Sequence, residues 1–195
     1  MSTYRIAIFA SGNGSNAQYI AEHFALHKQI SVVLILTNNP QAGVIGRAEK
    51  LNIPILLFNR QDFYESDLIL DQLIKERIDL VVLAGFLWKV PSIIIEKYPD
   101  KIINIHPALL PKYGGKGMYG KRVHLAVKEN KEEESGISIH LVNEHYDEGR
   151  IIFQAKCKID AESDTAEDIA EKVHALEYAH FPQVIEQWLL SNKSF

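Results

Sequence analysis

Short apolar segments alternate with longer segments of helical pattern over roughly the first hundred residues of the chain. Five apolar segments rich in β-branched residues have the length of strands and stop near Gly, Asn or Pro: 5–10, 31–37, 54–58, 79–84 and 101–105. Four segments between them have the periodicity and boundary residues of helices: 16–27, 43–51, 62–77 and 91–97. This alternation predicts βαβ units, and therefore a parallel sheet with helices on both faces.

The pattern changes after residue 105. Residues 106–120 contain two prolines and four glycines, which predicts a long irregular loop of the kind that is usually functional. The remaining elements are expected in this order: a short helix at 122–130, two strands at 136–142 and 150–159 that form an antiparallel hairpin through 143–149, and a final helix at 165–190, capped by Thr165 and kinked or restarted at Pro182. The expected fold is α/β: a Rossmann-like open sheet, mostly parallel, with a C-terminal antiparallel hairpin and a long final helix.

Composition narrows the class of protein. The 195 residues are 47% hydrophobic and 24% charged, the ordinary balance of a globular domain. A net charge of −4 argues against a nucleic-acid or membrane-surface partner. The single cysteine, Cys157, excludes an intramolecular disulfide and a cysteine-based zinc site. No segment resembles a signal peptide or a membrane span, so we expect a cytoplasmic enzyme or binding protein.

A glycine-containing loop of sequence SGNGSN follows the first predicted strand and precedes the first predicted helix. Gly12 and Gly14 permit positive φ angles and close approach of the backbone, and a helix N-terminus favours anions. The spacing also fits the weaker G-x-G-x-x-A form of the dinucleotide fingerprint, but the second strand is not followed by the acid that would hold a ribose. Ser15 and Asn16 add donors that suit a terminal phosphate. The simpler alternative is a tight turn capped by Ser or Asn.

A second group of polar residues lies near the end of the fifth predicted strand. Asn104 and His106 are two residues apart, so their side chains share one face of the sheet. In open α/β sheets ligands bind at the carboxyl ends of strands, where an amide can hold an oxyanion and a histidine can exchange a proton. A histidine before a proline can also be purely structural. Asp147 could orient the imidazole if the hairpin turn folded over the carboxyl edge of the sheet. Otherwise Asp147 is an aspartate of the kind that turns commonly contain.

Other features of the sequence favour simpler interpretations. His23 and His27 have the i,i+4 spacing of metal ligands, but no neighbouring residue completes a site, and no metal is expected. The aromatic residues Phe86 and Trp88 could line a ligand pocket or pack in the core. A serine nucleophile is disfavoured because the chain contains no G-x-S-x-G segment.

Three segments together resemble a known family. They are SGNGSN at 11–16, VLAGF at 82–86 and NIHPALLP at 104–111. With Asp147, and over almost the whole chain, they are similar to the 10-formyltetrahydrofolate-dependent formyltransferases. The NIHP motif with its LLP tail is specific to that superfamily. The glycine-containing loop narrows the resemblance to the branch that formylates 5′-phosphoribosylglycinamide in purine biosynthesis.

The resemblance implies a role for each residue of the two sites. Asn104 and His106 would stabilise the tetrahedral oxyanion that forms when the substrate amine attacks the formyl carbon of 10-formyltetrahydrofolate. Asp147 would hold His106 protonated and help to move protons from the amine to the leaving nitrogen. The substrate monophosphate would be held by three residues of the loop: Gly14, Ser15 and Asn16.

The resemblance also implies a further substrate contact and a folate site. Glu177, on the final helix, would lie near the substrate amine or ribose, although an ordinary surface glutamate is an equally simple interpretation. The folate would be held by backbone hydrogen bonds and apolar contacts from residues 87–90, from Asn104 and from residues 143–147. These residues are Leu87, Trp88, Lys89, Val90, Asn104, Asn143, Glu144, His145, Tyr146 and Asp147.

Two parts of the chain depart from the family pattern. Residues 113–120 are longer and richer in glycine than the common version, and we expect a lid that becomes ordered on binding. The family often has an arginine early in the helix after the third strand, which reaches the folate tail. Here residues 62–66 contain none and the nearest is Arg60, so the sequence leaves open what holds the glutamate tail.

The resemblance implies one catalytic domain over residues 1–195, with a phosphate-binding half at 1–100 and a catalytic, folate-binding half at 101–195. The length leaves no room for the extra domains of relatives that act on tRNA or hydrolyse formyl-folate, which favours the glycinamide ribonucleotide branch. The expected state is a monomer or homodimer. The alternatives are a formyltransferase or deformylase with another acceptor and, less favoured by the motifs, a Rossmann-type nucleotide-binding oxidoreductase.

Overall fold

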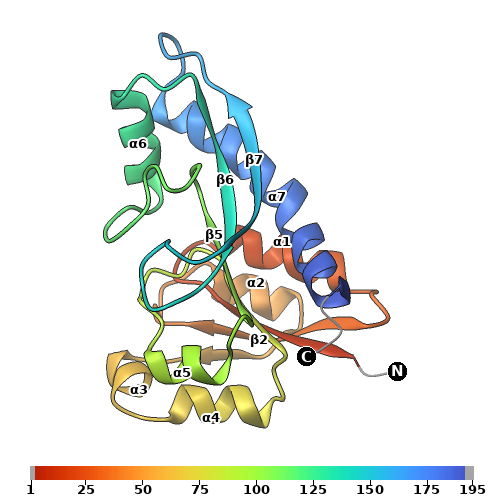
Figure 1. Cartoon of the computed structure of the whole chain (residues 1–195). Coiled ribbons are helices and arrows are strands. Elements are labelled where there is room, and N and C mark those ends of the chain that lie inside the picture. Colours follow the sequence, from red (N-terminus) through yellow and green to blue (C-terminus); the bar gives the residue numbers. More distant parts are fainter. Residues whose placement is uncertain (1–2, 192–195) are drawn as a thin grey trace.

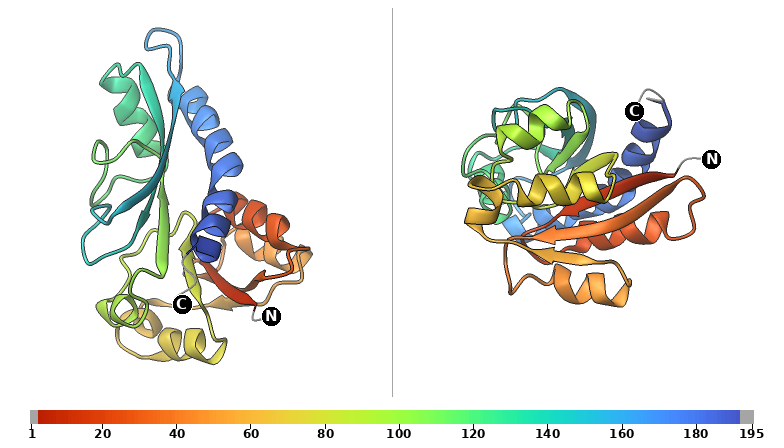
Figure 2. Two further views of the ribbon diagram at one scale, coloured as in Figure 1. Left: turned by 45° about the vertical axis from the view of Figure 1, so that its right-hand side comes forward. Right: turned by 90° about the horizontal axis from the view of Figure 1, so that it is seen from below.

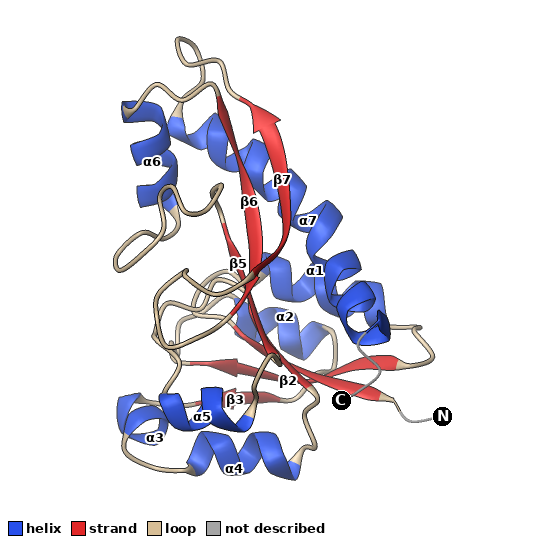
Figure 3. Cartoon of the chain, viewed as in Figure 1, coloured by secondary structure: helices blue, strands red, loops and turns tan. Residues whose placement is uncertain are grey.

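The computed structural model describes residues 3–191, and its strands form one twisted sheet with helices on both faces (Figures 1 and 3). The strand order is β3-β2-β1-β4-β5-β6-β7. Strands β1 to β5 are parallel, while β6 is antiparallel to both β5 and β7. The predicted fold class is therefore confirmed. The strands are β1 Tyr4–Phe9, β2 Ile30–Thr37, β3 Ile55–Leu57, β4 Leu80–Leu83, β5 Ile102–His106, β6 Glu134–Leu141 and β7 Ile151–Lys158.

The helices cover the two faces of the sheet unequally. One apolar core is closed by α1, α2, α6 and α7, and the other by α3, α4 and α5. Helix α7 runs along β6 and β7 and then beside α1, so it connects the two ends of the molecule (Figure 2). The helices are α1 Ser15–Phe24, α2 Val44–Lys50, α3 Arg60–Tyr64, α4 Leu68–Lys75, α5 Ser92–Lys97, α6 Lys121–Glu129 and α7 Ala166–Ser191.

The central strand β1 shows why its sequence is almost entirely apolar. Ile6 and Ile8 belong to the core under α1, α2 and α7, whereas Ala7 and Phe9 belong to the opposite core. All four side chains are buried, because successive residues of a strand point to opposite faces and both faces are covered by helices. A strand buried on one face only would alternate apolar with polar residues.

The single helix predicted at 62–77 is wrong, because the structure has two helices there, α3 and α4. The first begins two residues earlier than predicted, where Asn59 and Asp62 form a reciprocal capping box. It ends where the Ser66 hydroxyl donates to the Asp62 carbonyl oxygen at 2.9 Å. A serine that hydrogen-bonds the backbone in this way competes with the helical hydrogen bonds.

The final helix begins where the sequence predicts and continues without interruption past Pro182. Thr165 Oγ1 accepts from the Asp168 amide at 3.1 Å, which confirms the predicted cap. Pro182 lies inside α7, and the helix does not restart there. Phe181 and Ile185 on either side are fully buried, and their packing offsets a helix-breaking cost of about 3 kcal/mol. None of the helices within residues 3–191 has the length and apolar character needed to cross a membrane.

The strand order also determines where a ligand can bind. From β1 the chain proceeds outward to β2 and β3 on one side of the sheet, and later to β4 and β5 on the other side. The loops that leave the carboxyl ends of β1 and β4 therefore diverge and leave a crevice between them. This is the position in which open α/β sheets bind their ligands.

Candidate active site

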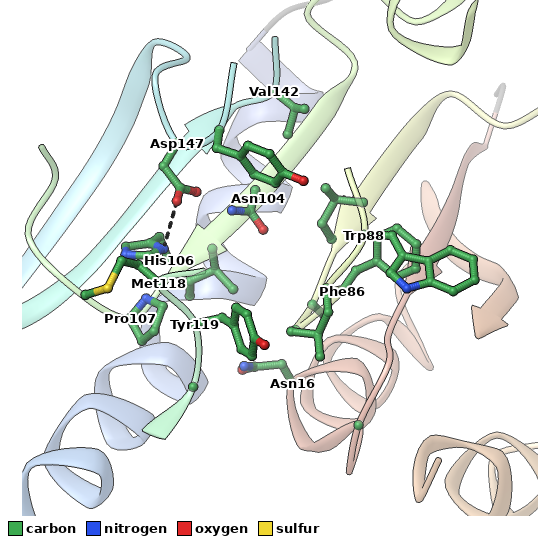
Figure 4. Close-up of a pocket in the computed structure, with 18 of the residues that line it drawn as sticks. Asn16, Phe86, Trp88, Asn104, His106, Pro107, Met118, Tyr119, Val142 and Asp147 are labelled. Atoms are coloured by element: carbon green, nitrogen blue, oxygen red, sulfur yellow. Dashed lines mark ion pairs between the residues drawn. The ribbon is translucent and has the colours of Figure 1, made fainter. Parts of the chain in front are cut away.

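A cleft of about 690 Å³ lies at this carboxyl edge of the sheet (Figure 4), a volume within the usual range of small-molecule sites. It brings together residues from both halves of the chain. The predicted site residues that line it are Gly14, Ser15, Asn16, Leu87, Trp88, Lys89, Val90, Asn104, His106, Asn143, His145, Tyr146, Asp147 and Glu177. Glu144 does not line the cleft; it lies in a smaller adjacent pocket with Tyr64 and Glu96.

The loop between β1 and α1 forms one end of the cleft. Gly14 is the N-cap of α1 with φ 75°, and no side chain caps this helix terminus. The first amide groups of a helix have no partner inside the helix, so they are available to an anion. A Cβ at position 14 would lie 2.5 Å from Val44 Cβ. Both the backbone conformation and the close approach of α2 therefore require glycine here.

Ser11 connects this loop to the two neighbouring strand ends. Its hydroxyl donates to Asn38 Oδ1 at 2.7 Å after β2, and accepts from the Leu87 amide at 3.1 Å after β4. A dinucleotide-binding protein would have its ribose-binding acid just after β2. Here that position is Asn38, whose side-chain amide already contacts Ser11. This arrangement disfavours the oxidoreductase alternative.

The predicted catalytic residues meet in the middle of the cleft. Asn104 and His106 extend from β5, and the connection between β6 and β7 brings Asp147 over the edge of the sheet (Figure 4). His106 Nδ1 lies 3.6 Å from Asp147 Oδ2. His106 Nε2 donates to the Tyr113 carbonyl oxygen at 2.7 Å. The contact between Asp147 and His106, which the sequence left open, is therefore present.

Burial and charge act in opposite directions on this pair. Burial lowers the pKa of His106, and Asp147 and the Tyr113 carbonyl only partly counteract it. For Asp147, burial alone would raise the pKa. The proximity of the His140 imidazole, the charge of the nearby His106 and the hydrogen bond from the Gly115 amide reverse this effect and hold the pKa of Asp147 below its ordinary value. Asp147 is therefore ionised at neutral pH and stabilises a positive charge on the imidazole.

His140 is a site residue that the sequence reasoning missed. It lies opposite Asn104 in the antiparallel pair of β5 and β6. Its Nδ1 donates to the Leu141 carbonyl at 2.8 Å, so Nε2 is free to accept from Asn104 Nδ2 at 3.0 Å. This bond orients the Asn104 amide. A signal existed in the sequence: Ser138 and His140 are polar, while the residues beside them in this strand are apolar.

Glu177 is buried, with 5% of its surface exposed, so the surface interpretation is wrong. Asn16 Nδ2 donates to Glu177 Oε2 at 2.8 Å, which connects α1 to α7 across 161 residues of sequence. Burial raises the pKa of Glu177, against the opposing effects of the Asn16 hydrogen bond and of His174. A buried acid whose hydrogen-bond partner belongs to the predicted phosphate site fits a polar ligand better than a purely structural role.

The cleft contains further residues that the sequence did not single out. Met118 and Tyr119 extend into it from the glycine loop, residues 113–120 (Figure 4). His124 and His174 form the wall beside Glu177. Burial, together with His174, lowers the pKa of His124 to about 4, so this histidine is neutral at pH 7 and is a poor candidate for a cationic role.

The aromatic residues after β4 serve both of the roles considered for them. Phe86 and Trp88 line the cleft and also pack against the core residues Phe58 and Phe63. The guanidinium of Arg60 lies 5.9 Å from the centre of the Trp88 ring. Arg60 therefore places a cation next to the predicted folate segment. Its position in the sequence differs from that of the arginine that the family often has.

The histidine pair on α1 has a partner that is distant in sequence. His23 Nε2 is 2.7 Å and His27 Nε2 is 3.4 Å from the carboxylate of Glu186 on α7. A carboxylate from a helix distant in sequence therefore accompanies this pair. Even so, no group of three or more His, Cys, Asp or Glu side chains in the described part of the chain could hold a metal ion.

Comparison with known proteins agrees with these features. The formyl transferase family profile matches residues 4–185. The chain is 40% identical over 187 residues to the chloroplastic phosphoribosylglycinamide formyltransferase of Arabidopsis thaliana, a match that covers 93% of this chain and 64% of the relative. It is 37% identical over 195 residues to the phosphoribosylglycinamide formyltransferase of Bacillus subtilis, with 97% of each chain covered.

A solved structure shows the same similarity. The phosphoribosylglycinamide formyltransferase of Bacillus halodurans superposes with a TM-score of 0.84 at 32% identity, and 95% of each chain is covered. The chain spans only 64% and 60% of two plant relatives, but almost all of the B. subtilis protein. The profile match covers most of the chain and includes both strand-end motifs of the cleft. The chain therefore belongs to the formyl transferase family.

Proposed function

We propose that this chain transfers the formyl group of 10-formyltetrahydrofolate to the amine of 5′-phosphoribosylglycinamide in purine biosynthesis. One observation carries the proposal: a single cleft joins an uncapped helix N-terminus at Gly14 to the group formed by Asn104, His106 and Asp147. The first feature suits a phosphate and the second suits acyl transfer. The names of the relatives support this acceptor.

The geometry suggests how the substrates would be arranged. The monophosphate would bind at Gly14, Ser15 and Asn16, and Glu177 would bind a polar group between this end and the centre of the cleft. The folate would lie along the opposite wall, which consists of Leu87, Trp88, Lys89, Val90, Asn143, His145 and Tyr146. Glu144 lies outside the cleft, so the proposal gives it no folate contact.

The reaction would proceed by direct attack of the amine. A bond forms between the amine nitrogen and the formyl carbon, and the formyl oxygen becomes an oxyanion stabilised by Asn104 and protonated His106. The bond from that carbon to N10 of the folate then breaks, and the proton lost by the amine is delivered to N10. Asp147 favours the protonated form of the imidazole, against the effect of burial, and assists this proton transfer.

The proposal assigns residues 1–100 to phosphate binding and residues 101–195 to catalysis and folate binding within one catalytic domain. Small-molecule substrates are the expected partners, and the assembly is a monomer or homodimer. We place the reaction in the cytoplasm; the single cysteine supports a reducing compartment, in which disulfides are rare.

A formyl-transfer assay with a choice of acceptors tests the proposal. Purified protein would be mixed with 10-formyltetrahydrofolate and, in separate reactions, glycinamide ribonucleotide, a sugar amine, methionyl-tRNA or water alone. We expect tetrahydrofolate and formylated product only with glycinamide ribonucleotide. Release of formate without an acceptor would indicate a deformylase instead, and transfer to another amine would change the assigned substrate.

Replacing Gly14 with Ala tests the phosphate end of the cleft. Because the Cβ would meet Val44 and the φ angle of 75° disfavours alanine, we expect the free energy of unfolding to fall by about 2 kcal/mol. The KM for glycinamide ribonucleotide should rise more than the KM for the folate. Gly46, exposed on α2 with open space around it, is the control position; its change to Ala should slightly stabilise the protein. Equal effects on both KM values would contradict the assignment.

A further inference from the structure

The first three residues of the glycine loop, residues 113–115, lie beside both His106 and Asp147. Tyr113, in a left-handed conformation with φ 58°, directs its carbonyl oxygen to His106 Nε2. Two residues later, the Gly115 amide donates to Asp147 Oδ2 at 2.9 Å. The same short segment therefore contacts both His106 and Asp147, and its position determines where the imidazole lies.

The backbone of this segment has little conformational preference of its own. Gly114 and Gly115 follow Tyr113, and glycine loses more conformational freedom on folding than any other residue. The segment is also packed tightly, because a Cβ on Gly114 would lie 2.6 Å from Leu110 Cδ2 and 3.3 Å from Asp147 Cβ. A segment that has so little conformational preference and must occupy such a narrow position needs an attachment outside itself.

The Tyr113 side chain provides that attachment. Its ring packs against the main apolar core, and its hydroxyl donates to Glu132 Oε1 at 2.8 Å. Glu132 lies in the connection between α6 and β6, and its carboxylate also accepts from Lys112 Nζ at 2.9 Å. The tyrosine thus connects the segment to an element that is outside the cleft.

We propose that Tyr113 and Glu132 are positioning residues of the transfer reaction, whose hydrogen bond holds the Tyr113 carbonyl against His106. This inference rests on the proposed function. A carbonyl oxygen can only accept, so the contact requires a proton on Nε2. The other ring nitrogen faces Asp147 and binds a second proton when the ring is charged. The segment therefore orients the imidazole so that its charged form has a partner on both sides.

The charges around the proposed pair are consistent with this role. His106 is faced by Asp147 and His140, and His124 is close enough to interact electrostatically. Burial, together with the bond to Glu132, raises the pKa of Tyr113 to about 12, so its hydroxyl remains a donor. The hydrogen bonds from Lys112 and then Tyr113 lower the pKa of Glu132, which remains an ionised acceptor.

The test compares Tyr113→Phe with two variants of its partner. Tyr113→Phe and Glu132→Ala remove the bond, whereas Glu132→Gln keeps an oxygen that can accept it. We expect the first two to lower kcat about tenfold with little change in either KM, because misplacing a catalytic group slows the chemical step. Glu132→Gln should restore most of the rate. Lys112→Gln, which leaves the bond intact, is the matched control and should behave as the wild type.

A second measurement separates positioning from a general loss of stability. The His106 ring would be followed by two-dimensional ¹⁵N NMR across a pH titration, with its signals assigned by their loss in His106→Asn. A weaker carbonyl contact should lower the pKa of His106 in Tyr113→Phe and Glu132→Ala, but not in Lys112→Gln. An unchanged titration and rate in folded Tyr113→Phe or Glu132→Ala would overturn the proposal.

The two measurements also separate this inference from the proposed function. The imidazole titration does not require turnover. If the wild type transferred no formyl group to glycinamide ribonucleotide, the proposed function would fail, while the titration would still show whether Tyr113 holds His106.

Discussion

Asp147→Asn should reduce the kcat of formyl transfer by about 10²- to 10³-fold while leaving the fold intact. The variant removes the negative charge that lies 3.6 Å from His106 Nδ1 and opposes the effect of burial on the imidazole. It changes little else, because Asp147 has φ 57° and asparagine tolerates this conformation as well as aspartate does. The pKa of His106 should fall in the variant, since an interaction that favours the protonated ring has been lost.

Single-turnover kinetics would measure the chemical step, and thermal unfolding would confirm the fold. Asp100→Asn is a matched control, because Asp100 is also a left-handed aspartate with φ 55° but is exposed and does not line the cleft. The control should retain the wild-type rate. A folded Asp147→Asn enzyme with a near-native kcat would show that the carboxylate has no part in the reaction.

His106→Ala should lower kcat by about 10³-fold, because it removes the positive charge that stabilises the oxyanion. KM for the phosphorylated substrate should change much less, because the phosphate end of the cleft consists of other residues. The double variant with Asp147→Asn should be about as slow as His106→Ala alone, since Asp147 acts through the imidazole.

His23→Ala is the control for the loss of a histidine. His23 contacts Glu186 between α1 and α7 and does not line the cleft. Its removal should cost at most about 1 kcal/mol of stability and leave kcat unchanged.

The double variant of His106 and Asp147 has one outcome that would contradict the prediction. If its loss, measured as a free energy of activation, equalled the sum of the two single losses, the two residues would act independently.

The alternation of strands and helices was predictable because it depends on local patterns. Each predicted strand has a counterpart within about two residues, since period-two burial and turn residues are properties of short segments. The main error was the helix at 62–77. Its apolar periodicity extends through Ser66, and only the hydrogen bond from that hydroxyl to the backbone shows where the first helix ends.

The site was predictable where a residue lies at the end of a strand or helix. Asn104, His106 and the residues around Gly14 could be placed at one edge of the sheet, because parallel strands have their carboxyl ends together. His140 was missed, since its importance comes from an antiparallel pairing with a strand 36 residues away. Glu144 was predicted to contact the folate but lies outside the cleft. The direction of a side chain in a turn depends on how the turn packs, which the local sequence does not determine.

The sequence by itself therefore determined the α/β architecture, the family resemblance and the residues with the necessary chemistry, because these follow from local periodicity and from short motifs. Only the tertiary structure decided that Asp147 reaches His106, that Glu177 is buried against Asn16 and that Tyr113 contacts both His106 and Glu132. All of these contacts except the one between His106 and Tyr113 join residues that are far apart in the chain. Their distances depend on how the sheet twists and how α7 packs across it, and no local pattern in the sequence encodes those distances.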